Sequence, residues 1–253
     1  MRLSPANRKI KKLYKVRELK QYLSNEKKIY SFDLLAGHSC PSAKDCYSKA
    51  VEVDNKVKIR DGKDTKFRCY AASLEVIFPP VYKLHKENME ILRIAAEEGI
   101  NKVCDALQSI LPADAGIIRW HSSGDFKLKN YFLGFLKLVE ANPEILFYCY
   151  TKQLKLWIAA LDTVNRLPNL VMTASYGGMC DHLIAPYNLR NSKVVFSREE
   201  AKKLNLQIDY SDKLAANPKL KFKSFALLIH GIQPKGTSAA DAWQKIKMEN
   251  KYD

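Results

Sequence analysis

The chain has 253 residues, and 47% of them are hydrophobic, which is enough for one large α/β domain or two small ones. No apolar run approaches the roughly 20 residues that cross a bilayer, and the basic N-terminus lacks the apolar core of a secretory signal. We therefore expect a cytoplasmic protein without a membrane partner. A formal net charge of +15 favours phosphate-rich partners, DNA or RNA first, although lysine-rich surface decoration is an equally weighted alternative.

The first 28 residues are strongly basic, with ten Lys or Arg against two Glu. The spacing of Ile10, Leu13 and Leu19 predicts a short amphipathic helix, which is either a basic arm or a packed helix. We find no internal repeat, low-complexity tract or linker. The predicted organisation is an arm or helix over residues 1–28 and a single β/α domain over residues 29–253, comprising a strand with a cysteine loop (29–78) and β/α repeats (79–253).

A strand-like run, Ile29–Ala36, stops at Gly37 and is followed by about forty residues that hold three cysteines and show little periodicity. A loop of that length inside a compact domain is usually functional or tied down. Beyond it, helical and strand patterns take turns. Helices are expected over 79–111 with a break at Gly99, 128–140, 154–167 and 198–204, the last capped by Ser197, and strands over 116–122, 145–151, 170–175, 194–196 and 225–229.

Alternating strands and helices are typical of parallel βαβ units. Nearly continuous apolar strands such as Phe225–Ile229 fit a sheet that is covered on both faces or closed into a barrel. We therefore predict an α/β fold, a parallel β/α partial or closed barrel (TIM-like), with the long cysteine loop after its first strand. In both versions ligands bind at the C-terminal ends of the strands.

Polar residues gather at those strand ends, and four of the five histidines lie there. A lone histidine on a strand is usually a satisfied core residue, but this clustering favours a shared site. Arg119, Lys152 and Lys235 are candidates to receive a phosphate or carboxylate group, and their alternative role is a solvated rim or a strand-end ion pair. The candidate catalytic residues are Asp125, His121 and His230, and the candidate cofactor-binding residues are Ser123, Gly124, Asp125, Lys152, Ser175, Asp181, His182 and Gln233.

Cys40, Cys46 and Cys69 are the candidate metal ligands, because thiolates are what soft iron and zinc sites require. Their spacing matches neither a zinc ribbon nor a ferredoxin, and small buried side chains are the alternative interpretation. For Cys104 and Cys149 packing is favoured, and Cys180 is a weaker candidate for a fourth ligand.

Around these residues the sequence resembles the phage gene-product-88 family, over nearly the whole chain from residue 31 to 236. The resemblance implies that Cys40, Cys46 and Cys69 belong to a shared pattern, and it suggests the cytoplasm of an infected or host bacterial cell. It rests on Phe32–Gly37, Cys40–Pro41, Lys44–Cys46, Phe67–Cys69, Ala71–Glu75, Arg119, His121, Ser123–Phe126, Tyr150–Lys152, Thr173–Ser175, Gly177–Gly178, Asp181–His182, His230–Gly231 and Gln233.

In layout the chain is also similar, more distantly, to radical S-adenosylmethionine enzymes, which place three cysteines after strand one of a partial barrel. A Gly-Gly-Glu-type turn after their second strand holds the amino group of the cosubstrate, and Gly124-Asp125 takes a similar place here. The resemblance implies a [4Fe–4S] cluster with S-adenosylmethionine. The departure is the cysteine loop, which is stretched where that superfamily's is compact.

Two other functions stay open. One is a basic nucleic-acid-binding protein with a structural metal, alternatively zinc, that uses its N-terminal lysines and the aromatic rings of Tyr14 and Tyr30. The other is a metal-dependent hydrolase. Its residues would be Asp125, His121, Asp181 and His182.

Overall fold

A computed structural model describes residues 1–252, so that Asp253, the end of the predicted domain, lies outside the described residues. Its centre is a seven-stranded sheet in the order β1-β2-β5-β6-β7-β8-β9, in which β1 pairs antiparallel with β2 and every other pairing is parallel. The strands are β1 (Ser4–Pro5), β2 (Lys28–Phe32), β5 (Ala115–Trp120), β6 (Leu146–Thr151), β7 (Leu170–Ser175), β8 (Asn191–Val195) and β9 (Phe225–Leu228), and a separate hairpin joins β3 (Ser48–Val53) to β4 (Lys56–Asp61).

Helices occupy most of the connections between the parallel strands. The α-helices are α1 (Tyr70–Ile77), α2 (Pro79–Glu98), α3 (Ile100–Gln108), α4 (Lys129–Ala141), α5 (Leu154–Ala159), α6 (Leu161–Arg166), α7 (Arg198–Lys203), α8 (Lys213–Ala216) and α9 (Ser238–Tyr252), and the 3-10 helices are η1 (Ile10–Lys15), η2 (Arg17–Tyr22), η3 (Asp181–Leu183) and η4 (Pro218–Leu220).

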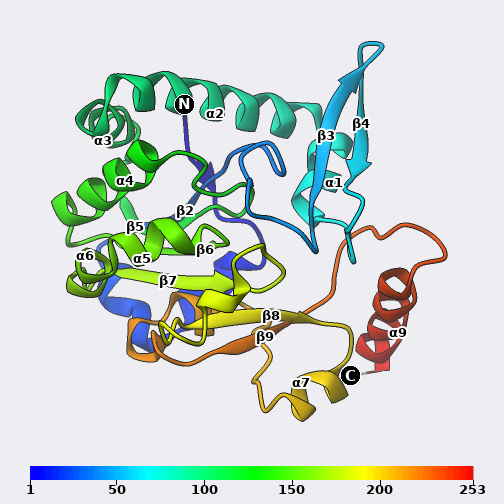
Figure 1. Ribbon diagram of the computed structural model, residues 1–253. Coiled ribbons are helices and arrows are strands. Elements are labelled where there is room, and N and C mark those ends of the chain that lie inside the picture. Colours follow the sequence, from blue (N-terminus) through cyan, green and yellow to red (C-terminus); the bar gives the residue numbers. More distant parts are fainter. Residues whose placement is uncertain (253) are drawn as a thin grey trace.

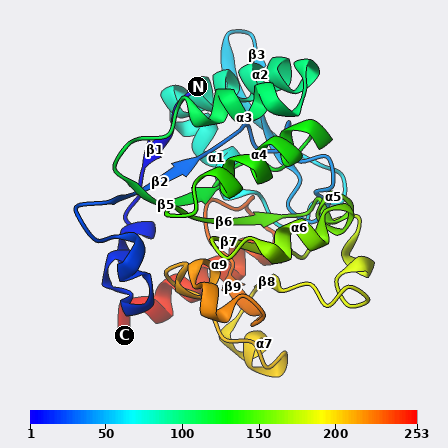
Figure 2. The same cartoon turned by 90° about the vertical axis from the view of Figure 1, so that its left-hand side faces the viewer.

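The sheet is covered on both faces. On one face α2 to α6 pack against a large apolar cluster that includes Trp120, Phe135 and Phe147. Figures 1 and 2 show these helices lying together on that side of the sheet. The opposite face is filled by the N-terminal segment and α8, whose apolar side chains meet Ile117 and Tyr148 of the sheet. Burial on both faces explains the nearly continuous apolar strands.

The prediction of a mixed α/β fold with parallel strands is confirmed, whereas closure into a barrel is not. Among the described residues β1 and β9 form the two edges of the sheet, and no pairing joins them. The strands that pair in parallel nevertheless follow chain order across the sheet. The C-terminal ends of these strands therefore all lie on the same side of the sheet. This is where the polar turns were expected to meet.

Local structure departs from the predictions in several places. Helices α1 and α9 were not predicted, and the first parallel strand ends at Phe32 rather than at Ala36. The cysteine loop is not irregular throughout, because it contains the β3–β4 hairpin, whose turn residues Asp54 and Asn55 both have positive φ, as a tight hairpin turn requires. The helix expected over 154–167 is broken at Ala160 into α5 and α6. The N-terminal helix is replaced by η1 and η2, which extended Val16 separates.

The first 28 residues pack onto the sheet rather than projecting from it. Ile10, Leu13 and Leu19 are fully buried, while the lysines between them face solvent. Within residues 1–252, no helix is long and apolar enough to cross a membrane. The domain limits themselves stay a prediction.

Candidate functional site

A cavity of about 220 Å³ lies at the C-terminal edge of the sheet and is lined by all three candidate thiols. Its walls come from the cysteine loop, from the turns after β5, β6 and β7, from β8 and β9, and from the N-terminal segment. Its lining includes Asn7, Lys9, Cys40, Cys46, Cys69, Tyr70, Arg119, His121, Ser122, Ser123, Gly124, Asp125, Tyr150, Thr151, Lys152, Ser175 and His230.

The cysteine loop is fixed to the sheet by the turn that follows β7. The backbone N–H groups of Lys44 and Asp45 both donate to the carbonyl of Gly177, at 3.0 and 2.9 Å. Gly177 has a φ of 91°, and a Cβ atom there would lie 2.8 Å from the Cβ of Asp45. The glycine is therefore required both by its backbone conformation and by the close approach of the loop that carries Cys46.

Gln233, after β9, holds the segment that carries Cys69. Its side-chain amide accepts a hydrogen bond from the N–H of Arg68 at 2.7 Å and donates to the carbonyl of Arg68 at 3.1 Å. Cys69 itself is the residue that precedes the first turn of α1. Gln233 is thus a positioning residue for the thiol rather than part of the cavity wall.

The three thiols are free and partly buried. Burial raises the pKa of Cys40, and the negative charges of Asp125 and Cys69 raise it further. Burial, with the nearby Cys46, raises the pKa of Cys69 to about 12. All three thiols line the same cavity. Without a bound cation Cys40 and Cys69 stay protonated at neutral pH. Because the thiolate is the nucleophilic form, these two thiols are poorly suited to nucleophilic catalysis.

Asp125 ties the turn after β5 to the end of β6. Its carboxylate accepts hydrogen bonds from Thr151 Oγ1 at 2.6 Å, from the N–H of Lys152 at 2.8 Å and from the N–H of Phe126 at 2.8 Å. Burial raises its pKa above the usual value although these bonds act in the opposite direction. Gly124 allows the turn to approach the cysteine loop, since a Cβ atom there would lie 2.6 Å from Ser39 Oγ.

Lys152 ties β6 to the end of β7. Its ammonium group donates to the carbonyl oxygens of Ser175 and Tyr176 and to Ser175 Oγ, at 2.7 to 3.0 Å. Three protein oxygens therefore already occupy the three donors of this ammonium.

His121 is buried and has a positive φ of 63°. Its Nε2 lies 2.7 Å from the hydroxyl of Tyr131, which also accepts a hydrogen bond from Trp120 Nε1 at 2.7 Å. Burial lowers the pKa of His121 to about 3. The imidazole is therefore neutral at physiological pH.

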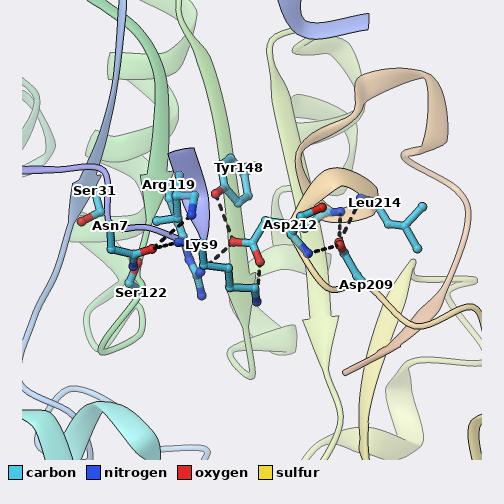
Figure 3. A network of polar contacts seen from close by, with 12 residues as sticks. Asn7, Lys9, Ser31, Arg119, Ser122, Tyr148, Asp209, Asp212 and Leu214 are labelled. Atoms are coloured by element: carbon cyan, nitrogen blue, oxygen red, sulfur yellow. Dashed lines mark hydrogen bonds and ion pairs between the residues drawn. The ribbon is translucent and has the colours of Figure 1, made fainter. Parts of the chain in front are cut away.

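Arg119 and Lys9, which line the cavity, belong to a buried ion network around Asp212 (Figure 3). The fully buried carboxylate of Asp212 contacts Arg119 Nη1 at 2.6 Å, Lys9 Nζ at 2.7 Å and the hydroxyl of Tyr148 at 3.1 Å. Burial acts to raise the pKa of Asp212, but the two cations and their hydrogen bonds together hold it below the usual value. The N-terminal segment is thereby joined to the sheet by an ion pair as well as by apolar packing.

Most of the residues predicted from the strand ends meet at this cavity. Those that do not line it are Asp181, His182, Gln233 and Lys235. The carboxylate of Asp181 accepts hydrogen bonds from the N–H groups of Gly177 and Gly178, so that it shapes the turn that holds the cysteine loop. His182 is exposed, and the pairing of Asp181 with His182 expected for a hydrolase has no counterpart in the cavity.

Sequence reasoning missed several residues of the cavity, among them Asn7, Lys9, Tyr70 and Ser122. Tyr150, which lines the cavity, and Tyr148, which contacts Asp212, carried a usable signal, because polar tips two residues apart on an apolar strand point to one face. For Lys9 no local signal exists, since its buried partner Asp212 lies two hundred residues away.

Two other hollows differ in character. A larger one of about 400 Å³ lies between α2 and α4 and contains none of the three thiols, and one of about 170 Å³ lies beside α9.

Over residues 1–252, no group of three or more His, Cys, Asp or Glu side chains is arranged to hold a single metal ion.

The fold and the cavity define an α/β protein with an open, mostly parallel sheet and a thiol-lined cavity at the C-terminal ends of its strands. The chain belongs to the gene product 88 family, whose model matches residues 1–247, as the resemblance in the sequence indicated. No curated protein and no solved structure matches it.

Proposed function

We propose that the protein binds an iron–sulfur cluster through Cys40, Cys46 and Cys69 and uses the adjoining cavity for a cosubstrate or substrate, in the manner of a radical S-adenosylmethionine enzyme. The observation that carries this proposal is the meeting of three free thiols from distant parts of one loop at a single cavity. Thiolates are the protein ligands of iron–sulfur clusters.

The surroundings of the thiols support a metal centre better than a thiol catalyst. A catalytic cysteine needs a neighbouring cation or base that lowers its pKa, whereas burial and neighbouring negative groups raise the pKa of Cys40 and Cys69. A metal centre supplies the missing positive charge itself. Three protein ligands also leave room for a fourth one from a bound small molecule.

The layout supports the radical-enzyme form of the proposal. The cysteine loop follows β2, the first of the parallel strands, and the Gly124-Asp125 turn follows β5, the next strand in the sheet. A bound cluster of this type supplies one-electron chemistry. The chain itself positions the thiols through Gly177 and Gln233 and holds the β5 and β6 turns together through Asp125.

Anaerobic purification and reconstitution test the proposal. We expect a brown protein with absorption at about 400 nm that contains both iron and sulfide. Replacing Cys40, Cys46 or Cys69 with Ser should abolish the iron content. Cys104→Ser is the matched control, because this partly buried thiol lies on α3 and outside the cavity.

Two outcomes would overturn the cluster. A colourless protein that holds zinc and no iron would make the thiols a structural staple for the loop, and equal loss of iron in the Cys104→Ser variant would remove the specific role of the three cysteines. Equilibrium dialysis of the reconstituted protein with S-adenosylmethionine tests the cosubstrate. We expect saturable binding there, and its absence would exclude the radical-enzyme form.

The β3–β4 hairpin favours nucleic acid as a second candidate function. Cross-strand pairing puts Lys49 opposite Arg60, Val51 opposite Lys58 and Val53 opposite Lys56, so that one face carries four basic residues. The other face, with Ala50 and Ile59, packs on α1. Figure 1 shows the hairpin projecting from the body of the protein. With a formal net charge of +15, this face fits a phosphate backbone.

Binding to duplex DNA and single-stranded RNA at several salt concentrations tests this second function. Each phosphate contact adds about −0.9 to the slope of log K against log salt for duplex DNA. Replacing Lys56, Lys58 and Arg60 with Gln should flatten that slope by about 2 to 3. A matched loss of charge at the exposed Lys155, Lys202 and Lys203 should leave it nearly unchanged, and equal effects of the two triple variants would refute the hairpin interface.

A further inference from the structure

Several polar groups of the residues that line the cavity have no protein partner. Among the described residues these are Arg119 Nε, His121 Nδ1, Ser122 Oγ and Tyr150 Oη, each of which is shielded from solvent. A buried polar group without a hydrogen bond is unfavourable by about 1–3 kcal/mol. Four such groups on residues that line one cavity favour a ligand that completes their hydrogen bonds.

The neighbours of His121 decide which of its ring nitrogens carries the proton. Trp120 Nε1 can only donate, so the oxygen of Tyr131 accepts from it. The contact between Tyr131 and His121 Nε2, 2.7 Å long, can run in either direction. We assign donation to Tyr131, because Trp120 Nε1 accepts nothing and His121 Nε2 is then the acceptor for the hydroxyl hydrogen. A neutral imidazole whose Nε2 accepts must carry its proton on Nδ1, which is the nitrogen without a partner.

The unpartnered groups are therefore rich in donors. Arg119 Nε and His121 Nδ1 only donate, and the two hydroxyls of Ser122 and Tyr150 can do so. The charges of the ion network also favour an anionic ligand, because two cations, Arg119 and Lys9, share the single carboxylate of Asp212. The hydrogen bonds of the Asp125 carboxylate come from Phe126, Thr151 and Lys152, and none of the four unpartnered groups is among its donors.

We propose that the cavity binds a small molecule through a carboxylate or phosphate group whose oxygens accept hydrogen bonds from Arg119 and His121. His121 then acts as a fixed neutral donor rather than as a general base. The inference rests on the same cavity as the proposed function and names the chemical group that the cavity recognises. It needs no bound cluster.

Matched ligand pairs separate the two possible anions. Adenosine 5′-monophosphate against adenosine tests phosphate, and S-adenosylmethionine against methylthioadenosine tests the carboxylate-bearing amino-acid group. We expect calorimetry on the full-length protein to show at least one charged ligand binding about 10–100-fold more tightly than its neutral counterpart. In the bound state the proton-attached ¹⁵N signal of His121 Nδ1 should shift.

Arg119→Lys keeps the charge beside Asp212 and removes the Nε donor, so we expect it to lose most of that preference. Arg166→Lys makes the same chemical change on an exposed part of α6 and should leave the preference intact. Equal binding of charged and neutral ligands, or an unchanged preference in Arg119→Lys, would overturn the inference. A colourless, iron-free protein that still prefers the anion would overturn only the cluster.

Discussion

His121 combines an unusual backbone conformation with a fully buried neutral ring. Its positive φ is tolerated because the imidazole stacks edge-on against Phe126, with ring centroids 4.5 Å apart, and shares a hydrogen bond with Tyr131. The sequence indicated that this histidine belongs to a site. Its protonation state depends on burial, which lowers its pKa to about 3.

This shift predicts a pH dependence of stability. Between about pH 3 and pH 6.5 the unfolded chain binds one proton at His121 that the folded chain does not, so stability is complete above that window and falls as the pH decreases. Within this window the proton uptake by His121 lowers the free energy of unfolding by about 1.4 kcal/mol for each unit by which the pH falls. Urea unfolding from pH 4.5 to 7 should show it.

His121→Asn is the comparison, because Asn tolerates the positive φ and has no titrating ring. In the variant, the free energy of unfolding should lose the part of its pH dependence that comes from His121. The part that comes from the carboxylates should remain. If both proteins respond identically to acid, the imidazole has the same pKa in the folded and the unfolded chain, and the neutral state assigned to the buried ring at low pH would be wrong.

At the scale of elements, the turns after β7 and β9 position the cysteine loop. The Gly177–Gly178 turn approaches the loop at Ala43 to Asp45, and Asp181 shapes that turn. Gln233 fixes Arg68. Two of the predicted cofactor-binding residues, Asp181 and Gln233, thus lie outside the cavity wall and hold the segments that carry the cysteines.

Gly177→Ala tests this arrangement. The substitution strains a backbone with a φ of 91° and places a Cβ atom 2.8 Å from that of Asp45, so we expect displacement of the Cys46 segment and a large loss of iron on reconstitution. Gly236→Ala is the control, since it imposes a similar positive φ of 73° with no atom within 4 Å. Strain alone should lower stability by about 1–2 kcal/mol in both variants. Equal iron content in the two would show that the contact with Asp45 is unimportant.

At the scale of the whole molecule, the N-terminal segment is part of the core. It covers the face of the sheet opposite α2 to α6, and Lys9 reaches the buried carboxylate of Asp212. Although the N-terminal segment is rich in basic residues, its apolar side chains therefore make it one of the layers that cover the sheet. Its solvent-facing lysines still contribute to the net charge of +15.

Leu13→Ala measures how far this segment stabilises the fold. Leu13 is fully buried, so we expect a loss of about 2–5 kcal/mol in the free energy of unfolding. The neighbouring exposed Lys12→Ala should change it by less than about 0.5 kcal/mol. A loss below 1 kcal/mol for Leu13→Ala would instead favour a detachable arm.

The sequence by itself determined the order of the six parallel strands and of helices α2 to α7, and the end of the sheet at which polar residues gather, because hydrophobic periodicity and capping are local properties of the chain. Leu170–Ser175 and the Ser197 cap appear where the pattern predicted them. The strand turns also pointed correctly to Cys40, Asp125 and Lys152 as neighbours of one cavity.

Only the tertiary structure decided which of those side chains remain available to a ligand. Asp125 and Lys152 are engaged by protein groups, whereas Arg119 and His121 keep an unpartnered donor each. It also decided that the sheet stays open and that Lys9 pairs with Asp212. The physical reason is that burial and hydrogen-bond satisfaction depend on segments far apart in the sequence, and no local pattern of residues records their contact.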